Sequence, residues 1–437
     1  MANNFFKKLK KFVSKHQVPL LFLASRAFIL LFPPPYYSDV SHDYERYANM
    51  WWYGLPPYLK HYYEYPPATI PLLIVPLLLD LHGIGRYYLN YRLQIFLIDA
   101  LLFAFILKAL KRLKFKKRSK NLSILFYIAA PVIAKNFFYE GLDLTFAGIL
   151  TIGIISILLY SQKKLIRRIL FWLLFWLSTS IKFMSLPLVA PFFYLKKLSF
   201  KKELLSFLLA FLIIWGAPLA IFRSSLSVSF VFHLKRPLKY ASFPSFLVET
   251  ANYFTQTEVR IEEAPDFQLV GPVSKFITQT VAIVFPLSIL FISLYFIVAI
   301  LKNSPKDSFK TLLKRVLFLE KIKLDHLDPF VFSLKVCLIF IFTLFSTGKI
   351  FSQPFHIWYI PLIALFPFKS IKKKLTFMGL ATWLLIKDTT PWVVLNGNKF
   401  FIKPIKVNFI SSLMRFIPMF ILLFLSFKLP NKTKVKN

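Results

Sequence analysis

The sequence is poor in cysteine, glycine and acidic residues. One cysteine, Cys337, occurs in 437 residues, and it lies inside an apolar run, which excludes an intramolecular disulfide framework. Charged residues make up 17% of the chain, below the roughly 25% of soluble domains. The chain has only 19 acidic residues but 56 lysines and arginines, so its formal net charge is +37. Such a charge is typical of nucleic-acid-binding proteins or of membrane proteins with basic loops.

Apolar residues are abundant, at 57% of the chain with 52 phenylalanines. They form runs of about 15 to 25 residues, the length that a helix needs to cross a hydrocarbon core of ~30 Å. Basic residues cluster where these runs end, with eight of them from Lys108 to Lys120. This placement is typical of cytoplasmic loops beside anionic lipid, and it argues against a nucleic-acid partner. We therefore expect an integral membrane protein whose nearest partners are membrane lipids.

The alternation of apolar runs and basic clusters predicts an all-α, multi-pass helical bundle with about twelve crossings. The chain is expected to form one polytopic domain over residues 1–437 in the cell membrane, with both termini cytoplasmic because their flanking segments are basic. The predicted crossings are 17–34, 91–110, 122–135, 143–160, 169–181, 184–195, 203–222, 276–300, 328–346, 355–367, 375–386 and 409–427.

This threading leaves two long segments, 35–90 and 223–275, on the external face. The first contains an apolar stretch at 68–83 that is short and interrupted by two prolines. A full crossing there would move the basic cluster at 108–120 to the outside, against the positive-inside rule. We therefore predict a re-entrant or broken helix, which is possible where protein covers the backbone.

Unusual polar residues gather on the predicted external face. An ionisable group near the membrane is costly and usually faces protein or a wet cavity, so such a group marks a candidate site. For a single lysine, snorkelling at a helix end is the alternative explanation. The residues are Asp39, Asp43, Glu45, Glu64, Glu140, Asp143, Lys182, His233, Arg236 and Lys349.

The stretch 233–246 has the side chains that bind phosphate. His233, Lys235, Arg236 and Lys239 fall within seven residues, and such groups make charge-assisted bonds to phosphate oxygens. Cations also stabilise a departing phosphate, and a nearby carboxylate can act as general base on a hydroxyl. The combination indicates glycosyl transfer from a lipid phosphate, although these cations could instead merely hold lipid headgroups.

The first external segment pairs acids with aromatic rings. "DYERYANMWWYG" can form a short helix with Tyr44, Tyr47 and Trp51 on one side. Such rings suit the membrane interface, and they also suit stacking on sugar faces. An anchoring role accounts for the aromatics but leaves Asp39 and Asp43 unexplained.

The chain contains an ordered series of motifs across residues 39–361: "SDV" with Asp39, Tyr44, "GLPPY" with Tyr58, "EYPP" with Glu64 and Tyr65, "GLDLTFAGIL" with Asp143, "SIKFMSLPLVAP" with Lys182, "FHLKRPLKYAS" with His233 and Arg236, and "GKIFSQPFHIWYIPL" with Lys349, Ser352 and Trp358. This series resembles the GT-C superfamily of polyprenyl-phosphate-sugar-dependent glycosyltransferases, in particular glycosyltransferase family 87 and related mannosyltransferases. The family often has Ser-Pro-Gln where this chain has "SQP" at 352–354.

The resemblance implies an inverting hexosyltransferase, with mannose as the expected sugar. The donor would be a polyprenyl- or dolichyl-phosphate sugar, and the acceptor a glycolipid or lipid-linked glycan on the external face. An external aspartate acts as base in the family; Asp39 is preferred by position, with Asp43 as helper or acceptor ligand. The expected donor-phosphate ligands are Arg236, His233, Lys182 and Lys349, and the expected substrate-binding residues are Tyr44, Tyr58, Glu64, Tyr65, Asp143 and Ser352.

Three points stay open at this level. Asp39 and Asp43, at i and i+4, could share a divalent metal, but two carboxylates and a nearby His42 make a poor ligand shell, so no metal residue is assigned. A GT-C-like ligase or polymerase that moves a whole glycan is the alternative enzyme. A lipid or solute transporter is the non-enzymatic alternative, although its charges would be expected near the bilayer midplane.

Overall fold

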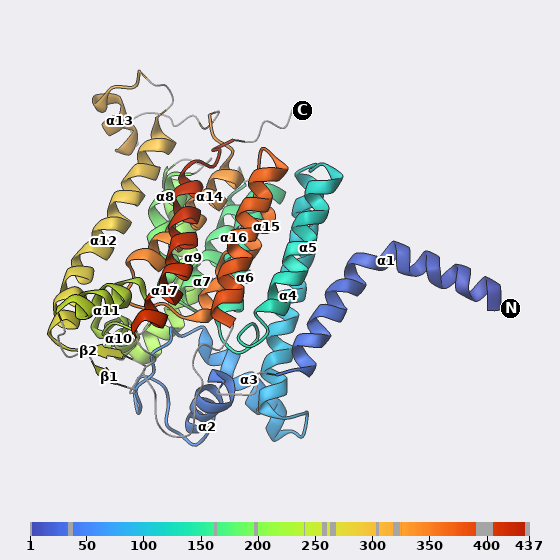
Figure 1. Cartoon of the computed structure of the whole chain (residues 1–437), viewed down its shortest axis with the longest axis horizontal. Helices are drawn as coiled ribbons and strands as arrows, with labels where there is room; N and C mark the ends of the chain where they lie inside the picture. The colour runs from blue at the N-terminus through green and yellow to red at the C-terminus, as the bar shows by residue number, and fades with distance from the viewer. Residues whose placement is uncertain are drawn as a thin grey trace.

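Helices make up nearly all of the regular structure in this computed structural model, which describes residues 2–33, 38–160, 164–195, 200–239, 241–255, 260–262, 268–302, 306–317, 324, 326–389 and 405–432 (Figure 1). The α-helices are α1 (Ala2–Leu31), α2 (Glu45–Trp52), α3 (Thr69–Leu81), α4 (Tyr87–Arg112), α5 (Lys117–Ile133), α6 (Asp143–Leu159), α7 (Leu165–Thr179), α8 (Val189–Tyr194), α9 (Phe200–Phe222), α10 (Ser227–Lys235), α11 (Phe243–Thr255), α12 (Pro272–Leu301), α13 (Phe309–Val316), α14 (Pro329–Thr347), α15 (Ile360–Leu365), α16 (Ile371–Thr389) and α17 (Ile405–Phe427). The short 3-10 or π helices are η1 (Val40–Tyr44), η2 (Phe183–Leu188), η3 (Arg223–Leu226) and η4 (Gln353–Trp358), and the two strands are β1 (Arg260–Glu262) and β2 (Gln268–Val270).

The predicted crossings fall largely on helical structure in the described residues. The runs 91–110 and 276–300 lie inside α4 and α12, whereas 184–195 and 355–367 are each divided between a 3-10 helix and a short α-helix. Judged by length and composition, four helical stretches among the described residues can cross a membrane: α4, α9 continued through η3 into α10, α12 and α14. The chain is therefore described as a helical membrane protein, and the count of about twelve crossings stays a prediction.

Burial separates inner helices from outer ones. The inner helix α14 is buried along nearly its whole length and contacts α6, α12 and α17. The outer helices α9 and α12 expose large apolar side chains, including Leu212 at 58% and Phe291 at 72%. Apolar surface of this extent is unfavourable in water but suits contact with lipid acyl chains.

The predicted broken helix at 68–83 forms α3, which packs against α4. Its 13 residues span about 20 Å, less than the ~30 Å hydrocarbon core. The chain then reverses through Gly83 and Gly85, whose φ angles of 74° and 72° lie in the region that favours glycine. The position of α3 relative to the bilayer stays a prediction.

The segment 223–275 carries ordered helices in its described part. The chain leaves α9 through η3 and α10, then forms α11 and the antiparallel pair β1–β2, in which Ile261 pairs with Leu269. Pro272 begins α12, a position where its missing N–H costs no helical hydrogen bond. These elements lie together at one end of α12 (Figure 1).

A buried ion pair attaches α1 to the bundle. Arg26 Nε donates to Asp99 Oδ2 of α4 at 2.7 Å, and both side chains are fully buried. Asp99 also accepts hydrogen bonds from the hydroxyls of Tyr127 and Tyr139, at 2.6 and 2.8 Å. Because Pro131 has no N–H, the carbonyl of Tyr127 lacks its helical donor, and Arg26 Nη2 donates to it at 3.2 Å.

Removing one member of this pair is expected to destabilise the bundle by about 3–5 kcal/mol, because the other charge remains buried without a partner. The Arg26→Met substitution should therefore lower the thermal midpoint in detergent more than the double change Arg26→Met/Asp99→Leu. Fluorescence-detected size exclusion after heating measures both midpoints. Arg46→Met is the control, because Arg46 pairs with Asp43 at an exposed position. A double variant less stable than Arg26→Met would contradict the argument.

Candidate functional site

Three elements distant in sequence meet at the carboxylate of Asp143. Lys182 Nζ and Trp358 Nε1 each donate to Asp143 Oδ1 at 2.7 Å. Asp143 is the first residue of α6, where the helix N-terminus favours an anion, and its side chain is buried. The Lys182 ammonium also lies over the rings of Phe355 and Trp358, at 5.1 and 5.6 Å from their centroids. Asp143 therefore holds Lys182 in one place.

Asp39 lies near these groups at the N-cap of η1, half-buried and without a capping hydrogen bond from its side chain. Burial raises the pKa of its carboxyl to about 6. The negative charges of Asp43 and Asp143 also raise this pKa, whereas the positive charges of Lys239 and Lys182 lower it. A carboxylate with such a pKa is a stronger base than an ordinary aspartate and is still mostly ionised at neutral pH.

A hydrogen-bond chain holds the backbone just before Asp39. Ser38 Oγ donates to Glu140 Oε2 at 2.5 Å, and Tyr88 donates to Glu140 Oε1 at 3.0 Å. Arg92 Nε lies 2.9 Å from the same Oε1, and its two terminal nitrogens donate to carbonyls in the last turn of α1. Arg92 and Glu140 thereby fix the end of α1 and the start of η1 relative to α4.

The two candidate bases have different surroundings. Asp43 Oδ1 lies 3.2 Å from Arg46 and 3.3 Å from His42, and its side chain is 28% exposed. Asp39 instead shares its electrostatic surroundings with Lys239 and Lys182. The preference for Asp39 as base is consistent with this difference, although neither role is tested by it.

Arg236 and Lys239 lie near a second acid, Glu64. Burial raises the pKa of Glu64, and Arg236 at the C-cap of α10 opposes this shift most strongly. The pKa of Lys239 falls to about 8, because it is buried and lies near Arg236, while Asp39 and Glu64 oppose the shift. His233 Nδ1 is buried and has no hydrogen-bond partner among the described residues. Arg236 and Lys239 thus share a partly desolvated space with the acids Glu64 and Asp39.

Lys349 supports this region through the backbone. Its Nζ donates to the carbonyl of Leu234 at 2.7 Å, and its own carbonyl accepts from Lys239 N at 3.0 Å. These bonds hold the segment after α10 that carries Lys239. Ser352 is in an extended conformation before η4, and its hydroxyl does not cap that helix.

The aromatic residues of the first external segment pack on one another. Tyr47 and Trp51, predicted on one side of a helix, stack at 6.3 Å between ring centroids. The buried ring of Tyr44 meets that of Tyr65 edge-on at 5.8 Å. Tyr58 adopts a φ of 64° and donates to the carbonyl of Tyr65. This packing gives the segment between η1 and α3 a defined shape.

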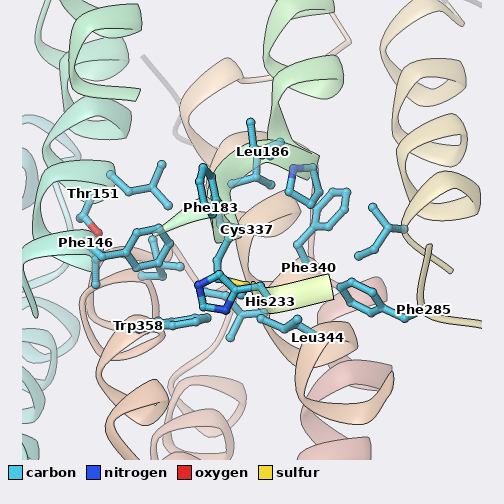
Figure 2. A pocket seen from close by; sticks show the side chains of 18 of the residues that line it. Phe146, Thr151, Phe183, Leu186, His233, Phe285, Cys337, Phe340, Leu344 and Trp358 are labelled. Atoms are coloured by element: carbon cyan, nitrogen blue, oxygen red, sulfur yellow. The ribbon is translucent and has the colours of Figure 1, made fainter. Parts of the chain in front are cut away.

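An apolar cavity of about 220 Å³ adjoins Trp358, the residue whose ring nitrogen bonds to Asp143. His233 and Trp358 line it together with apolar side chains from several helices, among them Cys337, Phe340 and Leu344 of α14 (Figure 2). Trp358 reaches Asp143 with its ring nitrogen while its ring lines the cavity. Trp358 therefore connects the apolar cavity with the pair of Asp143 and Lys182.

A second polar cluster was not predicted from the sequence. Asp388 accepts from Arg415 Nε at 2.7 Å and lies 2.5 Å from His356 Nε2, whose other ring nitrogen is 2.9 Å from the Tyr359 hydroxyl. Arg415 also donates to the carbonyl of Ala241, which has a φ of 82°. The cluster thus supports the turn that follows Lys239. An arginine inside the apolar run 409–427 was the available signal.

The described residues do not fit a resident divalent metal. No group of three or more His, Cys, Asp or Glu side chains within the described ranges is placed to hold an ion. Asp43 is paired with Arg46 and His42, which competes with an ion shared between Asp39 and Asp43.

Comparisons with protein-family models, with curated proteins and with solved structures found no match for this chain. The resemblance to GT-C glycosyltransferases therefore depends on the sequence motifs alone and stays a prediction. The chemistry of the site is the remaining basis on which an activity can be inferred.

The carboxyl of Asp39 is expected to titrate with a pKa of about 6 in the folded protein. Difference infrared spectra of wild type and Asp39→Asn should show its protonated C=O band growing as pH falls through that value. Lys239→Gln should move the midpoint to higher pH, because Lys239 favours the ionised carboxylate.

Lys235→Gln is the matched control for this titration, since Lys235 is an exposed lysine of the same segment and is not among the charges that act on Asp39. A midpoint near the ordinary aspartate value of about 4, or equal midpoints in the two lysine variants, would contradict the assignment.

Proposed function

We propose that this protein is an integral-membrane hexosyltransferase that takes a sugar, with mannose as the first candidate, from a polyprenyl or dolichyl phosphate. It transfers the sugar with inversion to a glycolipid or lipid-linked glycan. In a bundle with about twelve crossings and a cytoplasmic N-terminus, the site faces the external side. The site consists of the start of α6, η1, the segment after α10 and η4.

One observation carries the proposal: a half-buried carboxylate, several cations and an apolar cavity occur together. Asp39 supplies a base with a pKa of about 6. Lys182 and Lys239 supply charge for a phosphate, and the cavity reaches Lys182 through Trp358. A lipid-phosphate sugar has the matching parts, an apolar chain, a phosphate and a reacting carbon, in that order.

The reaction proceeds by one displacement. Asp39 removes the proton of the acceptor hydroxyl as the acceptor oxygen attacks the anomeric carbon of the donor sugar. The new oxygen–carbon bond forms as the bond from that carbon to the phosphate oxygen breaks, and the phosphate leaves with the electron pair. Lys182, Lys239 and Arg236 stabilise the negative charge that develops on the phosphate.

Two further features support binding of the donor phosphate. His233 Nδ1 is buried at the cavity without a hydrogen-bond partner among the described residues, so a protonated His233 ring would donate from Nδ1 to a phosphate oxygen. Asp143 balances the charge of Lys182 by a fixed bond at 2.7 Å, which orders the ammonium before the donor arrives. The acceptor is expected against the segment that carries Tyr44, Glu64 and Tyr65.

Sugar transfer by the purified, detergent-solubilised protein tests the proposal. The protein receives labelled mannosyl- or glucosyl-phosphoryl polyprenol and a membrane lipid extract. Asp39→Asn is expected to lower the rate by about 10²–10⁴, the usual contribution of a general base. Glu45→Gln is the matched control, a half-buried acid of the same segment with no role in the mechanism.

The alternatives predict other outcomes. Full activity in folded Asp39→Asn together with loss in Asp43→Asn would transfer the role of base to Asp43. Activity only with a lipid-linked oligosaccharide donor would favour a glycan ligase or polymerase. Movement of lipid or solute across vesicles by wild type, without sugar transfer, would replace the proposal by transport.

Glu140 is expected to act on the reaction through Ser38, because their hydrogen bond orders the backbone next to Asp39. Glu140→Gln and Ser38→Ala should each lower kcat by about 10- to 100-fold, the cost of a small misplacement, with KM for the acceptor nearly unchanged. The double variant should be no slower than the slower single one. Additive losses would show that the two residues act independently.

A further inference from the structure

The short helix α13 (Phe309–Val316) lies at the end of α12 away from α10, α11 and the strand pair (Figure 1). It takes no part in the candidate site. Its sequence, "FKTLLKRV", is amphipathic, and Leu317 caps its C-terminus. Its position beside the end of a helix that can cross a membrane places it at the level of a bilayer surface.

Buried polar contacts fix the orientation of α13 relative to α12. Arg315 Nη1 donates to the carbonyl of Leu301, the last residue of α12, at 2.7 Å. The same nitrogen lies 2.7 Å from Asp307 Oδ2, and Arg315 is buried. Ser308 caps the first turn of α13 by accepting from Thr311 N. The face of α13 opposite Arg315 therefore points away from the bundle.

That outward face has an apolar stripe. Phe309, Leu313 and Leu317 follow one another at i, i+4 and i+8, and they are 80%, 46% and 59% exposed. Exposed Lys310 and Lys314, also spaced by four residues, form a parallel stripe directly beside it. In water the apolar stripe would remain solvated at a cost in free energy. At a bilayer surface the two stripes match the acyl chains and the anionic headgroups.

We propose that α13 is an interfacial helix that inserts Phe309, Leu313 and Leu317 into the boundary between headgroups and acyl chains. Lys310 and Lys314 pair with the phosphates of anionic lipids at the same depth. Through the Arg315 bond to Leu301, this insertion fixes the depth and tilt of α12. The proposal depends on the membrane character of the chain and is independent of the sugar-transfer activity.

Site-directed spin labelling of the full chain in lipid vesicles tests this. The single cysteine, Cys337, is buried and is first replaced in a Cys337→Ala background, so that new cysteines are labelled alone. Phe309→Cys and Leu313→Cys report on the apolar stripe, and Lys310→Cys reports on the lysine stripe. Collision of the label with oxygen measures contact with lipid, and collision with a water-soluble nickel chelate measures contact with water.

The expected result in vesicles of phosphatidylcholine and phosphatidylglycerol is a higher ratio of oxygen to nickel accessibility at positions 309 and 313 than at 310. The ratio at position 313 should fall when phosphatidylglycerol is omitted. It should also fall when Lys310→Gln or Lys314→Gln is added to the Leu313→Cys chain. Lys235→Gln, an exposed lysine elsewhere on the molecule, should leave it unchanged.

Three outcomes would overturn the proposal in whole or in part. Equal and high nickel accessibility at all three positions would mean that α13 stands in water. Low accessibility to both reagents at 309 and 313 would mean that protein, a second copy of the chain or another partner, covers the stripe. If the ratio of oxygen to nickel accessibility at position 313 did not depend on phosphatidylglycerol, the lysines would have no role in binding anionic lipid.

Discussion

A charge that is buried in a medium of low dielectric must find a partner, and this constraint organises the bundle. Five lysine– or arginine–carboxylate pairs of the described residues, each with at least one buried partner, join segments distant in sequence, so that each pair fixes the position of one segment against another. If either segment shifted along its axis, a charge would remain in an apolar environment without its partner. The pairs therefore restrict the relative positions of the segments more than apolar contacts do. The pairs are Arg26–Asp99, Arg92–Glu140, Arg168–Glu203, Lys182–Asp143 and Arg415–Asp388.

The same constraint creates the reactive character of the candidate site. Lys182 donates a hydrogen bond to Asp143, so the two charges offset each other and both side chains are fixed. The side chain of Asp39 makes no capping bond to η1, lies half-buried among charges of both signs, and has a pKa of about 6. Glu140 holds the backbone beside it through Ser38. Stable pairs thus surround one acid whose protonation can change near neutral pH.

An apolar cavity adjoins the polar network of the candidate site, and the proposal of a lipid-phosphate donor depends on it. Trp358 belongs to both, because its ring lines the cavity and its nitrogen bonds to Asp143. The other polar cluster, around Asp388, is bonded among its own members and supports the turn that follows Lys239. At the far end of α12, the exposed stripe of α13 continues the apolar outer surface, which is the basis of its proposed interfacial role.

The sequence by itself determined where helices form and which residue types are available for chemistry. Apolar runs such as 328–346 predict α14 within a residue or two, because a helix in lipid must satisfy its own backbone. The motifs also contained Asp39, Asp143 and Lys182. Only the tertiary structure decided the pairing, since Asp143 meets Trp358 across 215 residues of sequence and Glu140 meets Ser38 across 102. Such pairs depend on how helices pack, and no local pattern of residues encodes the packing partner of a buried charge.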